Sequence, residues 1–179
     1  MASAVESDVS QLRSLLGLFK RMDGSIDPSE MVGEITDRLR EELDYERERK
    51  AMYLYREMLE PKDFVHIPQP VDELSTDRLL TMDWVSGDPL NVWQDASQEV
   101  RNGIAKRLFW TWWLPVTRYA VIHGDPHLGN YTLRDDLSVN LLDFGCIRIF
   151  KPDFVQAVIT LYEALRDEDE EKAVSAYES

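Results

Sequence analysis

The amino-acid sequence predicts an α+β fold in which helices outweigh a few short strands. Apolar residues recur at helical spacing in several long segments, and short β-prone runs lie between them. The predicted helices cover residues 4–21, 28–59, 97–120, 152–165 and 168–178. The predicted strands cover residues 64–67, 78–85, 131–133 and 139–142. We expect one core, because 179 residues are enough for one domain and too few for two.

Local signals mark the ends of the longer predicted helices. Asp27-Pro28-Ser29-Glu30 carries an N-cap aspartate, a proline at the first helical position and a glutamate three residues after the cap. Pro61 ends the helix that follows. Asp95-Ala96-Ser97-Gln98 can form a second capping box before the helix 97–120, and Ser86-Gly87-Asp88-Pro89 is predicted to be a turn.

Composition narrows the possible classes of function. A net charge of −14 argues against a nucleic-acid partner, which needs a basic surface. Cys146 is the single cysteine, so no intrachain disulfide can form and a reducing compartment is expected. The apolar segment 108–116 is shorter than the roughly 20 residues of a membrane span, which favours a core helix over a membrane-facing aromatic patch. We expect a cytoplasmic protein and leave peripheral association with the inner membrane open.

Two motifs carry the predicted chemistry. The stretch HGDPHLGN (residues 123–130) places Asp125 five residues before Asn130, and LDFG (residues 142–145) places Asp143 thirteen residues after Asn130. Kinase-fold phosphotransferases use this arrangement. In it, Asp125 orients or deprotonates the attacking hydroxyl, and Asn130 and Asp143 bind Mg²⁺ against the nucleotide phosphates. A hairpin made of the strands 131–133 and 139–142 would return the two metal ligands to the same end.

The histidines of the first motif leave a second interpretation open. His123, Asp125 and His127 spell H-x-D-x-H, which is compatible with zinc or manganese in a hydrolase. His66 is the one remaining histidine and lies on a predicted strand, so further ligands are scarce. We therefore assign His123 to the catalytic loop as a residue that orients it, and predict that His127 hydrogen-bonds near the phosphates.

Two further segments make a family resemblance specific. LREELDYERE (residues 39–48) and LLTMDWVSGDPL (residues 79–90) occur in order before the two motifs. Together the four segments resemble the UbiB (AarF-type) family of atypical protein-kinase-like proteins. The resemblance implies a protein-kinase-like fold. Residues 1–85 would be the remainder of its small lobe with N-terminal helices, and residues 86–179 the start of a mostly helical large lobe.

The same resemblance implies roles for other residues and for partners. Glu42 is similar to the helix glutamate that pairs with the nucleotide-site lysine, and Asp44 completes the family's E-x-D element. Asp83, Trp84 and Val85 match the hinge that holds adenine through backbone groups. ATP and Mg²⁺ are the implied cofactors. The family supports ubiquinone biosynthesis, so lipids or quinone-biosynthesis proteins are the implied partners.

Three family elements do not occur in this sequence: a K-x-G-Q element, an alanine-rich nucleotide loop and a V-A-x-K strand lysine. We expect them to precede residue 1 in a longer parent protein, and we expect poor turnover by the chain alone.

Two alternative functions stay open. One is a small-molecule phosphotransferase of the aminoglycoside- or choline-kinase type, in which H-G-D-x-x-x-x-N is also common. The other is a non-catalytic, nucleotide-dependent scaffold that uses the aromatic residues Phe109–Trp113 at a membrane surface.

Overall fold

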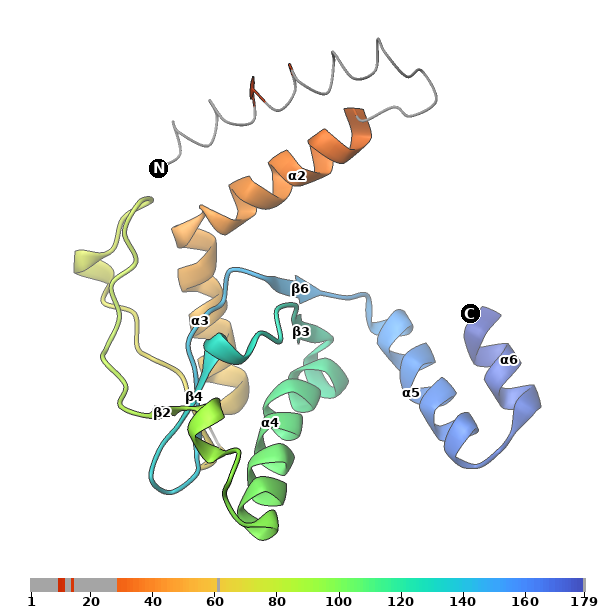
Figure 1. Ribbon diagram of the computed structural model, residues 1–179. Helices are drawn as coiled ribbons and strands as arrows, with labels where there is room; N and C mark the ends of the chain where they lie inside the picture. Colours follow the sequence, from red (N-terminus) through yellow and green to blue (C-terminus); the bar gives the residue numbers. More distant parts are fainter. Residues whose placement is uncertain (1–9, 12–13, 15–28, 61, 179) are drawn as a thin grey trace.

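The computed structural model describes residues 10, 11, 14, 29–60 and 62–178 (Figure 1). The predicted first helix, residues 4–21, lies almost wholly outside these residues, as do Asp27 and Pro28 of the predicted restart signal. The remaining chain combines helices with two small sheets, which confirms the α+β prediction.

The single helix predicted over residues 28–59 is wrong, because the segment forms two helices. They are α2 (Ser29–Glu42) and α3 (Tyr45–Leu59). Asp44 separates them: its Oδ1 accepts a hydrogen bond of 2.9 Å from the Arg47 backbone N–H, so the aspartate caps a new helix. The apolar stripe predicted on the second half is confirmed, since Met52, Tyr55 and Leu59 are buried.

In the described part of the chain, six short strands form two sheets. They are β1 (Val65–His66), β2 (Asp88–Pro89), β3 (Val121–His123), β4 (Tyr131–Leu133), β5 (Val139–Leu141) and β6 (Ile147–Ile149). The larger sheet has the order β1-β5-β4-β2, in which β1 and β5 are parallel and the other pairs antiparallel. The smaller sheet is the antiparallel pair β3-β6. The predicted hairpin therefore forms as β4 and β5, with Thr132 opposite Asn140.

The strand predicted over residues 78–85 is wrong. The segment makes only isolated bridges, between Thr76 and Leu79 and between Pro70 and Met82. The neighbouring segment contains Pro68 and Pro70, which lack a backbone N–H and cannot complete a ladder. The turn predicted at 86–89 instead ends in the short strand β2.

The remaining helices agree closely with prediction. They are α4 (Gln98–Tyr119), α5 (Pro152–Arg166) and α6 (Glu170–Glu178), with single-turn 3₁₀ segments η1 (Asp72–Leu74), η2 (Leu90–Trp93) and η3 (Leu128–Asn130). Ser97 caps α4 by accepting a hydrogen bond from the Val100 N–H at 3.3 Å. Ala120 ends α4 in the left-handed region, with φ of 56°, and turns the chain directly into β3.

The core lies where α3 and α4 meet the strands (Figure 1). It contains Tyr55 of α3, Leu114 of α4, Leu133 of β4 and Phe144, which follows β5. The core role predicted for residues 108–116 holds for Leu114 and Val116, whereas Phe109 and Trp110 are exposed. Figure 1 shows α5 and α6 as a helical hairpin beyond β6. Within the described residues, no helix has the length and apolar character needed to cross a bilayer.

Candidate functional site

The first motif forms a loop between β3 and β4, and its carboxylate is held by the loop itself. Asp125 Oδ2 accepts a hydrogen bond of 2.8 Å from the side-chain amide of Asn130, and its Oδ1 accepts one of 3.1 Å from the His127 backbone N–H. The Asn130 bond is the main reason that the pKa of Asp125 is lowered. Asp125 is therefore an oriented, ionised carboxylate at neutral pH.

The β4–β5 hairpin brings the two predicted metal ligands to one end, as the sequence predicts. Beyond the last strand pair, the Leu142 N–H donates to the Asn130 carbonyl at 3.0 Å, which sets Asn130 beside the residue preceding Asp143. Asp143 Oδ1 accepts from the Gly145 N–H at 2.9 Å. Because Asn130 uses its amide nitrogen toward Asp125, its carbonyl oxygen keeps its lone pairs.

His123 joins the two motifs. Its ring is buried, Nε2 hydrogen-bonds to the Asp143 carbonyl, and Nδ1 accepts from the Asp125 N–H at 3.4 Å. A carbonyl can only accept, so Nε2 carries the proton and Nδ1 is the acceptor. Both ring nitrogens are thus engaged within the protein. This geometry suits the orienting role predicted for His123 and leaves neither nitrogen for a zinc ion.

Gly124 allows a second junction between the motifs. Its N–H donates to the Cys146 carbonyl at 2.9 Å, just after the D-F-G triplet. A Cβ at this position would lie 2.6 Å from that carbonyl oxygen, which no side chain can tolerate without a backbone shift. Glycine is therefore required for the close approach of the two loops.

His127 remains accessible. Its ring is exposed, and Nδ1 accepts from the Gly129 N–H at 3.1 Å. The proton is therefore on Nε2, which can donate to an anion in front of the loop. A Cβ on Gly129 would lie 2.9 Å from His127 Nδ1, so glycine permits this turn.

Sequence reasoning missed Glu48. Its Oε1 accepts a hydrogen bond of 3.3 Å from the Phe144 N–H of the D-F-G triplet. Burial raises the pKa of Glu48, helped by the nearby negative charge of Asp143. A signal was present in the sequence, because Glu48, Met52 and Tyr55 fall on one stripe of α3 at helical spacing. A carboxylate on a buried stripe needs a partner.

Glu42 and Asp44, the two acidic residues to which the family resemblance assigns roles, lie at the junction of α2 and α3. Glu42 is the last residue of α2, and its side chain lies outside what the structure describes. Asp44 is exposed and caps α3. Its carboxylate therefore has a local structural role in this geometry.

The predicted hinge is an extended, exposed segment. The Asp83 N–H donates to the Gln69 carbonyl at 2.9 Å, and Trp84 is 90% exposed. Trp84 and Val85 line a polar cavity of about 650 Å³ together with Asp136 from the β4–β5 turn. No hydrogen bond in the described part of the chain joins Asp83, Trp84 or Val85 to the Asp125 loop.

Asn140, which the sequence did not single out, anchors the end of the hinge to the hairpin. It is fully buried, and its amide nitrogen donates to the Ser86 carbonyl at 3.0 Å and to Thr132 Oγ1 at 2.9 Å. Its side-chain oxygen accepts from Arg134 Nε at 2.8 Å. All of these polar atoms are paired across three segments, so Asn140 fixes where the chain enters β2 relative to β4 and β5.

Glu41 forms a separate junction behind the D-F-G segment. Its Oε2 lies 3.0 Å from Arg38 Nη1, 3.4 Å from Arg47 Nη1 and 2.8 Å from Arg148 Nη2. These arginines belong to α2, α3 and β6 respectively. One carboxylate therefore connects both helices to the strand that follows the D-F-G triplet.

A loop that bears an aspartate and an asparagine, joined by a hairpin to a D-F-G segment beside a long helix, defines a kinase-like protein. The model of the ABC1 atypical kinase-like domain matches residues 1–177. The chain belongs to this family, which confirms the resemblance to UbiB (AarF-type) proteins.

Individual relatives of the chain are also atypical kinases by name. The chain is 30% identical to the mitochondrial atypical kinase coq-8 of Caenorhabditis elegans, over 97% of this chain and 24% of that protein. It is also 30% identical to the mitochondrial atypical kinase COQ8B of Rattus norvegicus, over 97% of this chain and 33% of that protein. The chain thus spans about a quarter to a third of these relatives.

A solved structure supports the fold. Rv3197 from Mycobacterium tuberculosis, determined in complex with erythromycin, aligns with a TM-score of 0.80 at 22% identity. The alignment covers 97% of this chain and 44% of the other. This likeness supports the kinase-like α+β fold.

Proposed function

We propose that the chain contains the magnesium- and nucleotide-binding centre of an ABC1-family phosphotransferase or ATPase. The observation that carries the proposal is the hydrogen-bonded chain from Asp125 to Asn130 and on to Leu142, next to Asp143. It gathers three oxygen-bearing side chains from a loop and a hairpin. Phosphoryl transfer requires mainly such positioning and charge neutralisation.

The donor set fits Mg²⁺, which prefers a few hard oxygen ligands and completes its shell with water and phosphate. In the described part of the chain, neither Asn130 Oδ1 nor Asp143 Oδ2 accepts a hydrogen bond, so both are available. When bound there, Mg²⁺ would neutralise charge on the nucleotide phosphates. His127 Nε2 would donate to the same phosphates.

Asp125 would hold the phosphate acceptor. Its lowered pKa keeps it ionised, so it can accept a hydrogen bond from an attacking hydroxyl or water. A weakly basic carboxylate acts chiefly by orientation, and a loose transition state needs little proton removal before bond cleavage. His123, which hydrogen-bonds to the backbone of both residues, would hold Asp125 in a constant position relative to Asp143.

We further propose that Glu48, rather than Glu42, is the partner of the nucleotide-site lysine. In kinases a glutamate of the long small-lobe helix holds that lysine. Glu48 lies on the buried stripe of α3 and contacts the D-F-G backbone. Burial raises the pKa of Glu48, and no ion pair to Glu48 occurs within the described residues, so a neighbouring cation would stabilise its charged form. The adenine-holding role of Asp83, Trp84 and Val85, and the E-x-D role of Asp44, stay proposals from the resemblance.

For the full-length protein, we propose a role in ubiquinone biosynthesis, because the relatives are COQ8 and UbiB proteins. Its partners would be lipids or quinone-biosynthesis proteins, and it would act at the inner membrane as a peripheral protein. The family assignment does not favour the aminoglycoside- or choline-kinase alternative, nor the scaffold without catalysis.

Manganese binding tests the centre directly. Electron paramagnetic resonance can count free Mn²⁺ in the presence of ATP, for the chain and for two variants. We expect Asp143→Asn to weaken Mn²⁺ binding by about tenfold or more, because it removes an anionic ligand. Asp153→Asn, which changes an exposed aspartate in the first turn of α5, is the control and should bind as the parent does. Equal binding by all three proteins would refute the proposed centre.

A further inference from the structure

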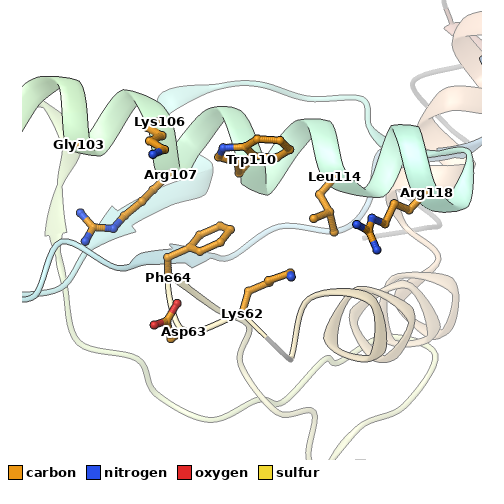
Figure 2. A pocket seen from close by; sticks show the side chains of 9 residues that line it. All are labelled: Lys62, Asp63, Phe64, Gly103, Lys106, Arg107, Trp110, Leu114 and Arg118. Carbon is orange, nitrogen blue, oxygen red and sulfur yellow. The ribbon is translucent and has the colours of Figure 1, made fainter. Parts of the chain in front are cut away.

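A second cavity, of about 620 Å³, lies between α4 and residues 62–64, which follow α3 (Figure 2). None of the motif residues lines it. Its size falls in the range of ligand pockets, about 300–1,000 Å³. Figure 2 shows side chains of one face of α4 opposite those of Lys62, Asp63 and Phe64.

The charge around this cavity is opposite to that of the chain. Four cations line it, whereas the chain as a whole has 34 acidic and 20 basic residues. The four are Lys62, Lys106, Arg107 and Arg118. Asp63 is the one carboxylate on the wall. A net positive cavity in an acidic protein attracts anions.

These four cations also differ from most others in the chain. Elsewhere a cation usually contacts a carboxylate, as in Arg49–Asp72 at 2.9 Å and Lys172–Glu163 at 3.0 Å. Within residues 29–60 and 62–178, the four cavity cations form no ion pair. Their charge is therefore available to a ligand.

The middle of the cavity is apolar. Phe64, Trp110 and Leu114 lie between the charged ends. Figure 2 shows Arg118 and the Lys62 amine toward one end and Arg107 toward the other, with the rings of Phe64 and Trp110 between them. Such walls suit a flat apolar body, because aromatic faces gain from stacking and from burial.

We propose that this cavity binds a small organic anion, in which a phosphate or carboxylate is attached to an aromatic or other flat apolar body. An inorganic anion would use only the cations, and a neutral apolar compound would use only the middle. An anion with an apolar body uses both, with its head near Lys62 and Arg118 and its body against Trp110. The inference goes beyond the nucleotide site and does not depend on it.

Isothermal titration calorimetry with 1-naphthyl phosphate tests the proposal, with 1-naphthol and inorganic phosphate as the half-ligands. We expect 1-naphthyl phosphate to bind more tightly than either half-ligand. The double variant Lys62→Gln/Arg118→Gln should weaken its binding by about tenfold or more. Arg78→Gln, which removes an exposed cation outside the cavity, should bind as the parent does.

A second variant separates binding from folding. Gly103 lines the cavity, and a Cβ there meets only Arg107 Nη1, at 3.7 Å. Gly103→Leu should therefore fill the cavity while improving the helix, so binding should fall with no decrease in Tm.

Several results would overturn the proposal. These are no binding of 1-naphthyl phosphate, equal binding by all variants, or binding of inorganic phosphate as tight as that of 1-naphthyl phosphate. Displacement by excess Mg-ATP would assign the probe to the nucleotide site instead. Binding to anionic phospholipid vesicles without binding of 1-naphthyl phosphate would identify a membrane surface, and would also reject a small-molecule pocket.

Discussion

The segment that carries the motifs, residues 121–149, and the helical pair α5–α6 are built in different ways. In the motif segment, short strands and loops are tied by buried groups, including His123, Asn140 and Phe144. In the helical pair, five large apolar side chains are exposed: Phe154, Tyr162, Leu165, Val174 and Tyr177. Among the residues of the pair whose side chains the structure describes, only Val155, Ala164 and Ala176 are buried.

The difference shows which kinds of contact hold side chains in defined positions in each region. The helical pair packs chiefly on itself and closes through local contacts such as Lys172–Glu163. The motif segment instead is joined to distant parts of the chain by hydrogen bonds across large sequence separations, as between Ser86 and Asn140 and between Glu48 and Phe144. We expect its substitutions to be costly and those in the helical pair to be mild.

The largest contrast should come from one pair of phenylalanines. Phe144 is 1% exposed and packs on Tyr55 and His123, whereas Phe154 at the start of α5 is 53% exposed. We expect Phe144→Ala to lower the free energy of unfolding by about 3–5 kcal/mol. Phe154→Ala should lower it by less than about 1 kcal/mol. Urea titration followed by tryptophan fluorescence measures both, and similar losses would contradict the contrast.

A buried and an exposed asparagine, Asn140 and Asn102, form a second pair whose alanine variants can be compared. Asn140 is fully buried, and Asn140→Ala removes its bonds to Ser86, Thr132 and Arg134, so we expect a loss of about 2–3 kcal/mol. Asn102 on the exposed face of α4 accepts only from Gln98, and Asn102→Ala should change stability by less than about 0.5 kcal/mol. The same urea titration applies. A small loss for Asn140→Ala would mean that the hinge end is held by other contacts.

Two glycines form a third pair, in which we expect substitution by alanine to change the free energy of unfolding in opposite directions. Gly124→Ala forces a methyl group against the Cys146 carbonyl, and we expect a loss of about 1–3 kcal/mol. Among the described residues, nothing besides the backbone of its own helix and its chain neighbours lies within 4 Å of a Cβ added to Gly33 in α2, so Gly33→Ala should stabilise by about 0.5–1 kcal/mol. Thermal unfolding should give a lower Tm for the first variant and a higher one for the second. Equal shifts would refute the steric argument.

The smallest effect concerns pH. Burial lowers the pKa of His66 on β1, aided by the nearby Arg134. The unfolded chain therefore binds the proton more readily. The stability due to neutral His66 is complete above about pH 6.5 and is lost as pH falls toward the lowered folded value. The stability difference between the parent and His66→Gln should shrink from pH 7.5 to 5.5. A constant difference would exclude this linkage.

The sequence predicted the parts of the site that depend on local patterns. The spacing of Asp125, Asn130 and Asp143 and the two short strands of the hairpin are local. The structure pairs Asp125 with Asn130 and sets Asn130 beside Leu142, the residue before Asp143. The capping box predicted at residues 95–98 located the start of α4 to within one residue, although the residue that caps the helix is Ser97 and not Asp95, the first residue of the box.

The failures are of two kinds. Some signals were present in the sequence but were given too little weight. The apolar period across residues 28–59 favoured one helix, although Asp44 can cap a second one. The β-prone residues in 78–85 favoured a strand, although Pro68 and Pro70 in the neighbouring segment cannot complete a ladder. Other features exist only in three dimensions. The bond from Phe144 to Glu48 spans 96 residues. The helical stripe that Glu48 shares with Met52 and Tyr55 could therefore indicate that Glu48 is buried, but not which residue it contacts.

The junction at Glu41 has a consequence for solution conditions. Its three arginine partners are partly exposed, so dissolved ions can screen these contacts. High ionic strength should loosen the hold of α2 and α3 on β6, the strand that directly follows the D-F-G triplet, while leaving the buried bonds of His123 and Asn140 intact. The mobility of that one strand would then depend on salt concentration, while the loop that bears Asp125 would stay in place.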